Sequence, residues 1–274
     1  DPIDAIKMAS YNAARAYGIR GVGAIAPGYK ADMVLLEDLK DFKVKQVISR
    51  FGRPYTGEEQ IPSPILPPQV FNSVRLPEIS KYDLALRCHV SAPVIKMIPH
   101  QLVTELVYRD VERDENGCFI PSEGMVKLAV IERHHATGSM AVGILEGLGI
   151  KHGAVASTVA HDSHNLVVAG DNDEDMLMAI ESLRECGGGY SVVSRGVVLA
   201  RLPLPIAGLM TAAPVNDVLE IQQALLDALY SLGAKRDSDP LIALSFMALP
   251  VIPAVKLTDE GLFDAVNFKF IKYN

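Results

Sequence analysis

The stretches KLAVI at residues 127–131 and GAVASTV at residues 153–159 decide the fold class of this 274-residue sequence. Both runs are apolar, and each is long enough for one strand but too short for a typical helix, so we predict two buried strands. Residues 173–186 follow with apolar side chains at helical spacing, and the glycines at 187–189 are placed to end that helix. Strands that alternate with helices indicate an α/β domain, with α+β as the alternative.

The same pattern continues toward the C-terminus. Residues 190–201 are rich in valine and predict further strand structure. Asp217 and Glu220 have the spacing of a capping box, which predicts the start of another helix there. Gly233 is placed to end this helix, and its apolar stripe would be formed by Ile221, Leu225, Leu229 and Leu232.

Upstream of this domain the sequence predicts a separate module. Residues 3–17 have helical spacing, and residues 32–37 and 43–49 predict two strands. The stretch 61–78 contains five prolines, which remove backbone donors and interrupt both periodicities. We therefore predict an extended linker there, and with it the main domain boundary.

Composition excludes several classes of function. The net charge is −7 and no run of Lys or Arg occurs, so a nucleic-acid partner is not expected. No apolar stretch approaches the ~20 residues of a membrane span, and no signal peptide is recognisable. The three cysteines, Cys88, Cys118 and Cys186, form no CxxC pair, which argues against disulfides and structural zinc and favours the reducing cytoplasm. Because the chain opens in a helical pattern without an initiator Met, we expect a fragment or a processed product.

Two segments of the sequence resemble known families. Residues 12–18, NAARAYG, and residues 23–34, GAIAPGYKADMV, resemble the closing stretch of the amidohydrolase superfamily. In that superfamily the last helix of a TIM-type barrel leads into a small β-sandwich. The resemblance therefore implies a barrel helix at residues 1–20 and sandwich strands at residues 21–60.

The second segment is more specific. Residues 130–138, VIERHHATG, residues 153–165, GAVASTVAHDSHN, and residues 261–270, GLFDAVNFKF, resemble the extra C-terminal domain of bacterial adenine deaminases. The resemblance implies that residues 81–274 form this α/β domain, after a proline-rich linker at residues 61–80.

This resemblance implies a hydrolase that converts adenine to hypoxanthine and ammonia, in purine salvage or adenine catabolism. It also implies a manganese or iron site inside the barrel, where the metal would lower the pKa of water from ~16 towards ~7. The sequence departs from the family pattern because it contains no His-x-His, so no metal ligand can be assigned. We expect the chain to be inactive alone and the intact enzyme to be a homo-oligomer.

The densest polar cluster is His161-Asp162-Ser163-His164-Asn165, which follows a predicted strand. His161, Asp162 and His164 are candidate catalytic residues, because an imidazole titrates near ~6.5 and can relay protons. Ser163 and Asn165 are candidate substrate-binding residues that would hydrogen-bond a purine edge. A metal site on the two histidines is an alternative, but it needs a distant third ligand. The other alternative is that the cluster caps the strand end through local bonds.

A second cluster, Glu132-Arg133-His134-His135, follows the strand at residues 127–131. Arg133 and His134 are candidate substrate-binding residues that would converge with His161 in one pocket. The alternative is a solvated strand end with an internal ion pair.

Two other functions stay open for the whole chain. A related amidohydrolase would act on another purine or on a cyclic amide. A non-catalytic module would use the C-terminal domain as a lid over an active site or to hold subunits together.

Overall fold

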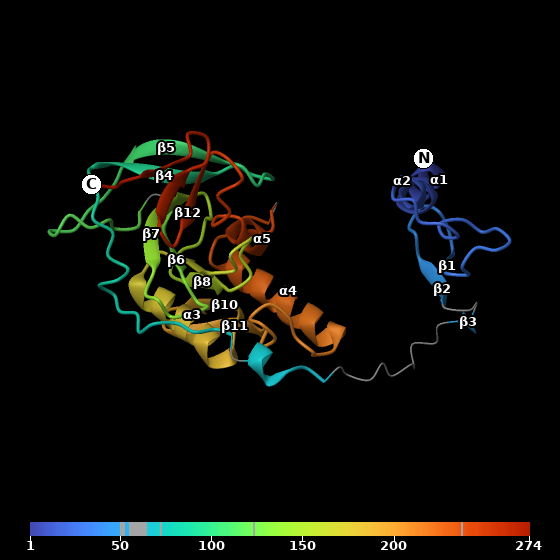
Figure 1. Cartoon of the computed structure of the whole chain (residues 1–274). Helices are drawn as coiled ribbons and strands as arrows, with labels where there is room; N and C mark the ends of the chain where they lie inside the picture. The colour runs from blue at the N-terminus through green and yellow to red at the C-terminus, as the bar shows by residue number, and fades with distance from the viewer. Residues whose placement is uncertain (50–52, 55–64, 72, 123, 237) are drawn as a thin grey trace. The chain divides into compact units, whose positions relative to one another are not determined.

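The computed structural model describes residues 1–49, 53–54, 65–71, 73–122, 124–236 and 238–274. The chain divides into two compact units, Asp1–Pro64 and Ile65–Asn274 (Figure 1). No described helix is both long and apolar enough to cross a membrane.

The first unit contains one helical segment followed by a small sheet. The segment consists of α1 (Pro2–Lys7), a π-helical stretch η1 (Met8–Asn12) and α2 (Ala13–Ala16), which confirms the predicted helix. The side chain of Asp1 accepts a hydrogen bond from the backbone N–H of Ile3, 2.7 Å away, and so caps the first turn. The strands β1 (Met33–Leu36), β2 (Val44–Ser49) and β3 (Arg53–Pro54) form an antiparallel sheet in that order.

The second unit is built on an eight-stranded mixed sheet in the order β11-β10-β8-β9-β6-β7-β4-β5. All neighbours are antiparallel except β4 and β7, which are parallel. With its helices this sheet confirms the α/β class. The strands are β4 (Ser91–Met97), β5 (Thr104–Asp110), β6 (Met125–Ile131), β7 (Met140–Glu146), β8 (Ala154–Ser157), β9 (Leu166–Gly170), β10 (Gly189–Ser194) and β11 (Val197–Pro203).

The sheet separates two apolar cores, because successive residues of a strand face opposite sides. Ala129 and Ile131 of β6 share one core with the apolar face of α3 (Asp173–Cys186). Leu128 and Val130 share the other core with Leu225 of α4 (Val215–Ser231) and with α5 (Pro240–Ser245). The second core also includes the small antiparallel sheet β12 (Val255–Thr258), β13 (Gly261–Asp264) and β14 (Lys269–Ile271).

Two local predictions differ from the structure. Helix α4 begins at Val215 after Pro214, and no side-chain hydrogen bond caps it, so the capping box at Asp217 and Glu220 was wrong. Asp217 lies instead within the first turn, where a carboxylate favours the positive end of the helix dipole.

The second prediction that differs is the extended linker in the proline-rich stretch. Residues 61–64 lie outside the described part of the chain, but the later residues of the stretch pack against the second unit. The second unit begins at Ile65, and a 3₁₀ turn, η2, covers Pro68–Phe71. Leu76 is buried, and the Arg184 guanidinium donates to the carbonyls of Leu76 and Pro77, 2.8 Å from each. The prolines of the described part therefore do not prevent a short 3₁₀ turn or packing against the domain.

Candidate functional site

The two polar clusters of the sequence lie on neighbouring loops at one end of the large sheet. Residues 132–139 connect β6 to β7, and residues 158–165 connect β8 to β9. Because β6 pairs with β9 and Ile131 lies opposite Leu166, the two loops leave the sheet side by side. Clusters about 30 residues apart in sequence are thereby brought into direct contact, at His134 Nε2 and the carbonyl oxygen of Ser163, 2.8 Å apart.

Arg133 joins three segments from a fully buried position. Its side chain is 1% exposed, and its guanidinium donates to the carbonyls of His164 (2.5 Å), Ser73 (3.3 Å) and Ala207 (3.2 Å). Burial lowers the pKa of Arg133, while the neighbouring Glu132 charge raises it. These contacts assign Arg133 to holding the loop rather than to an exposed substrate contact.

Glu132 organises the loop in which His134 and His135 lie. Its carboxylate accepts hydrogen bonds from the backbone N–H groups of His134, His135 and Thr137, and from the Thr137 hydroxyl. Burial alone would raise the pKa of Glu132, but these donors outweigh it and hold the pKa at about 2. The partners of Glu132 are therefore backbone and hydroxyl groups of its own loop, in place of the internal ion pair that the sequence left open.

His161 and His164 form an imidazole pair on the second loop. Their ring centroids are 5.8 Å apart, and the His161 ring also packs on Phe246 at 4.6 Å. Nδ1 of His164 is buried without a hydrogen-bond partner among the described residues. Burial, together with His161 and Arg133, lowers the pKa of His164, so this imidazole is neutral at pH 7. A neutral imidazole can accept a proton and later return it.

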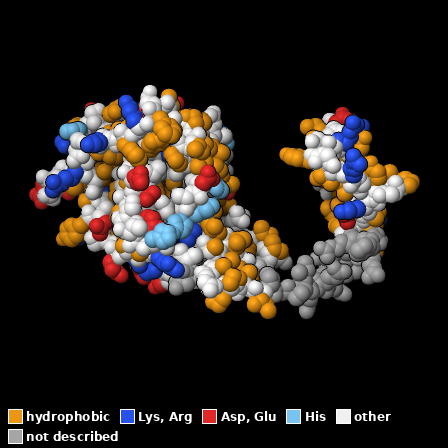
Figure 2. Space-filling model, viewed as in Figure 1, with side chains coloured by type: hydrophobic (Ala, Val, Ile, Leu, Met, Phe, Trp, Pro, Cys, Tyr) orange, Lys and Arg blue, Asp and Glu red, His pale blue; other side chains and the backbone are white. Residues whose placement is uncertain are grey.

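The remaining residues of the 161–165 cluster differ in their exposure to solvent. Asp162 and Ser163 are exposed, whereas Asn165 is only 4% exposed. The Asn165 amide donates to Oδ1 of Asp259 at 3.0 Å, and the Ser139 hydroxyl donates to Oδ2 of the same carboxylate at 2.9 Å. Asp259 is thus a member of the site that sequence reasoning missed, because it lies 94 positions from Asn165 in a turn with no recognisable motif. Figure 2 shows histidine side chains gathered on this unit with acidic side chains next to them.

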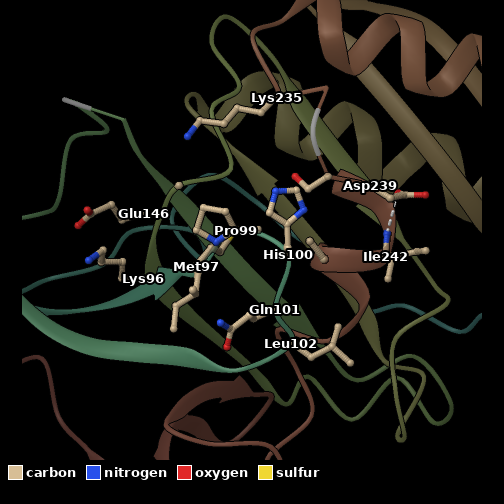
Figure 3. A pocket seen from close by; sticks show the side chains of 14 residues that line it. Lys96, Met97, Pro99, His100, Gln101, Leu102, Glu146, Lys235, Asp239 and Ile242 are labelled. Carbon is tan, nitrogen blue, oxygen red and sulfur yellow. Dashed lines mark hydrogen bonds between the residues drawn. The ribbon is translucent and has the colours of Figure 1, made fainter.

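A cavity of about 600 Å³ lies elsewhere on the same domain (Figure 3). It is lined by the ends of β4 and β7, by residues 98–102 and by α5, and none of the predicted site residues lines it. Glu146, which lies in the wall of this cavity, is the last residue of β7. The 132–139 loop joins this strand at its other end, next to Met140. Two of the charged residues in the cavity lining have partners within the protein: Lys96 pairs with Glu105 at 2.8 Å, and Glu146 with Arg109 at 2.9 Å.

A metal centre does not fit the residues that the structure describes. In the described ranges no three His, Cys, Asp or Glu side chains are grouped so that they could hold an ion. The imidazole pair of His161 and His164 therefore lacks the third ligand that a metal site on this loop needs.

Comparison with known families matches both units of the chain. Residues 101–269 match the family described as adenine deaminase C-terminal domain. Residues 1–54 match the amidohydrolase family. The first match includes both polar loops and the Asp259 turn.

Similar curated proteins are named adenine deaminases. The adenine deaminase of Nitratidesulfovibrio vulgaris (strain DP4) is 48% identical over 277 aligned positions, which cover 98% of this chain and 48% of that protein. Adenine deaminase 2 of Carboxydothermus hydrogenoformans is 45% identical, with 97% of this chain and 47% of the relative covered. The adenine deaminase of Lysinibacillus sphaericus (strain C3-41) is 42% identical, with coverage of 99% and 48%. The chain spans about half the length of the curated relatives it matches.

Proposed function

Because this chain belongs to the adenine deaminase C-terminal domain family, we propose that it takes part in the hydrolysis of adenine to hypoxanthine and ammonia. The proposal rests on one observation: the two polar loops contact each other, at His134 and the Ser163 carbonyl. Both loops lie within the residues that match this family. The names of the relatives support adenine as the substrate.

The catalytic metal is held, in this proposal, by residues outside these 274 positions. The amidohydrolase resemblance implies manganese or iron, whose chemistry is to activate water, but the described residues offer no ligand set for it. The steps assigned to this chain are therefore confined to proton transfer and positioning.

We assign proton transfer and positioning mainly to residues of the 158–165 loop. Replacement of an amine by oxygen requires a proton for the departing nitrogen, and the neutral His164 beside His161 can carry one. We assign substrate contact to Asp162 and Ser163, which are exposed on the same loop, and to His134, which contacts the Ser163 carbonyl. Arg133 and Asn165 act as positioning residues, because their polar groups already bind the protein.

A second candidate function is a lid that covers the active site without chemistry of its own. The contacts of Glu132 and Arg133 favour it, since they fix the backbone of both loops and leave few side chains free to react. We also propose a cytoplasmic location, which the free state of Cys88, Cys118 and Cys186 supports, and a homo-oligomeric enzyme, which rests on the family resemblance alone.

The test is made in the intact enzyme that contains this chain. His161→Ala and His164→Ala should each lower kcat/KM by ~10²-fold, the usual scale for a positioned acid or base. His89→Ala, at an exposed histidine away from both loops, is the matched control and should keep full activity. Melting temperature is followed for every variant.

The outcome separates the two candidates. An activity loss with unchanged melting temperature and a shifted pH profile supports proton transfer. Full activity in both variants, or a loss that follows unfolding, contradicts the acid–base role and leaves the loop as a lid or as a structural cap.

A further inference from the structure

A recess of about 330 Å³ adjoins the polar loops on the small sheet. Its apolar wall includes Phe263 of β13, Phe268, Phe270 of β14 and Val251. Its remaining rim includes Asp259 and Glu260, in the turn between β12 and β13.

The three phenylalanines form an aromatic wall that is open to solvent. The Phe263 ring lies 5.2 Å from that of Phe268, at 81°, and 5.3 Å from that of Phe270, at 67°. Phe268 is 82% exposed and Phe270 is 51% exposed. Rings of this size would normally be buried, so a group of them exposed around a recess indicates a surface that receives a ligand.

The charged residues on the rim indicate which kind of ligand fits the recess. Asp259 and Glu260 are carboxylates, and among the described residues no Lys or Arg lines the recess. Both carboxylate oxygens of Asp259 already accept hydrogen bonds, from Asn165 and from Ser139, so we assign the ligand contact to Glu260. Aromatic faces beside carboxylates favour a flat ring that carries N–H donors, and they disfavour a phosphate group.

We propose that this recess binds a free purine base, with its ring against the phenylalanines and its N–H groups directed at Glu260. The volume suits one base at the small end of ligand pockets. Asp259 on the rim accepts a hydrogen bond from Asn165, which belongs to the loop that carries His161 and His164. The inference rests on the proposed function for its choice of base, and it adds a binding site to that function.

The experiment is an equilibrium titration of the 274-residue chain with adenine, followed by calorimetry or saturation-transfer NMR. A ligand of this size in an open recess should saturate with a Kd on the order of 0.1–1 mM. Adenosine 5′-phosphate should bind at least fivefold more weakly, because its phosphate meets the two carboxylates. Phe268→Ala and Glu260→Gln should each weaken adenine binding at least fivefold.

Phe71→Ala is the matched control, since Phe71 is also an exposed phenylalanine but lies outside the recess. Phe268 is so exposed that its removal should leave the fold intact, which a melting curve verifies. The proposal is overturned if adenine does not saturate, if Phe268→Ala binds as well as the Phe71→Ala control, or if the phosphate-bearing ligand binds equally well.

A contact between two copies of the chain is the competing use of this surface. Sedimentation of the same variants detects it: if Phe268→Ala dissociates an oligomer and leaves adenine affinity unchanged, the recess is an interface and the proposal fails. Because the titration needs no turnover, loss of activity in the histidine variants does not affect its result. The two proposals can therefore fail separately.

Discussion

The amide of Asn165 donates a hydrogen bond to the carboxylate of Asp259 at 3.0 Å, across 94 positions of the sequence. This contact fastens the loop that carries His161 and His164 to the turn between β12 and β13. It connects the loop of the two histidines to a residue on the rim of the aromatic recess, and the strength of that contact can be measured.

Asn165→Asp should break this link without changing the size of the side chain. Two carboxylates would then face each other with one of them buried, and we expect a loss of about 1–3 kcal/mol in unfolding free energy at pH 7. The loss should shrink as pH falls towards 4, because protonation of the introduced carboxyl removes the repulsion. Asn216→Asp, in the exposed first turn of α4, is the control and should be neutral or slightly stabilising. Equal effects of the two substitutions would show that the Asn165–Asp259 contact contributes little.

Glu132 should make acid stability depend on the 132–139 loop. Its pKa is lowered from 4.5 to about 2 in the folded protein, so its contribution is fully present above pH 4.5 and is lost as pH falls from 4.5 towards 2. Glu132→Gln should therefore be less stable than the wild type at pH 6, by on the order of 2–3 kcal/mol. Urea unfolding at pH 6 and pH 3 should show this difference becoming smaller at the lower pH; a constant difference would contradict the prediction.

Lys256 should also make stability rise with pH, but in the alkaline range. Its side chain is fully buried, its amine donates to the carbonyl of Leu102 at 2.7 Å, and burial lowers its pKa from 10.5 to about 8. The unfolded chain then binds more protons than the folded one between pH 8 and 10.5, so stability relative to Lys256→Met should rise across that window. We expect a change on the order of 2 kcal/mol between pH 7 and pH 10. Lys272→Met, at an exposed lysine, should show no such change.

The 274-residue chain should release no ammonia from adenine when it is assayed alone, with or without added manganese. The reason is that its described residues contain no group able to hold the metal, and its sequence has no His-x-His. The assay is ammonia release at pH 7.5, with the intact enzyme as the positive control. Metal-dependent release by the purified chain, with contaminating enzyme excluded, would place the active site within these residues.

The sequence by itself determined that strands lie within residues 127–131 and 153–159 and that a helix covers 173–186, since apolar periodicity and helix-ending glycines are local properties. The second strand is shorter than predicted, Ala154–Ser157. It also carried the resemblance to the deaminase domain, which the family match confirms. The capping-box spacing of Asp217 and Glu220 gave the wrong start for α4, because the helix begins at Val215, directly after Pro214.

Only the tertiary structure decided how those elements meet. The pairing of β6 with β9 placed His134 against Ser163. The sequence suggested Arg133 as a substrate contact, but in the structure its side chain is buried and donates hydrogen bonds to three backbone carbonyls. The contact of Asp259 with Asn165 has no local signature, because it joins two segments that are 94 positions apart. Strand order and long-range packing set these contacts, and periodicity within a single segment contains no information about which segment will become its neighbour.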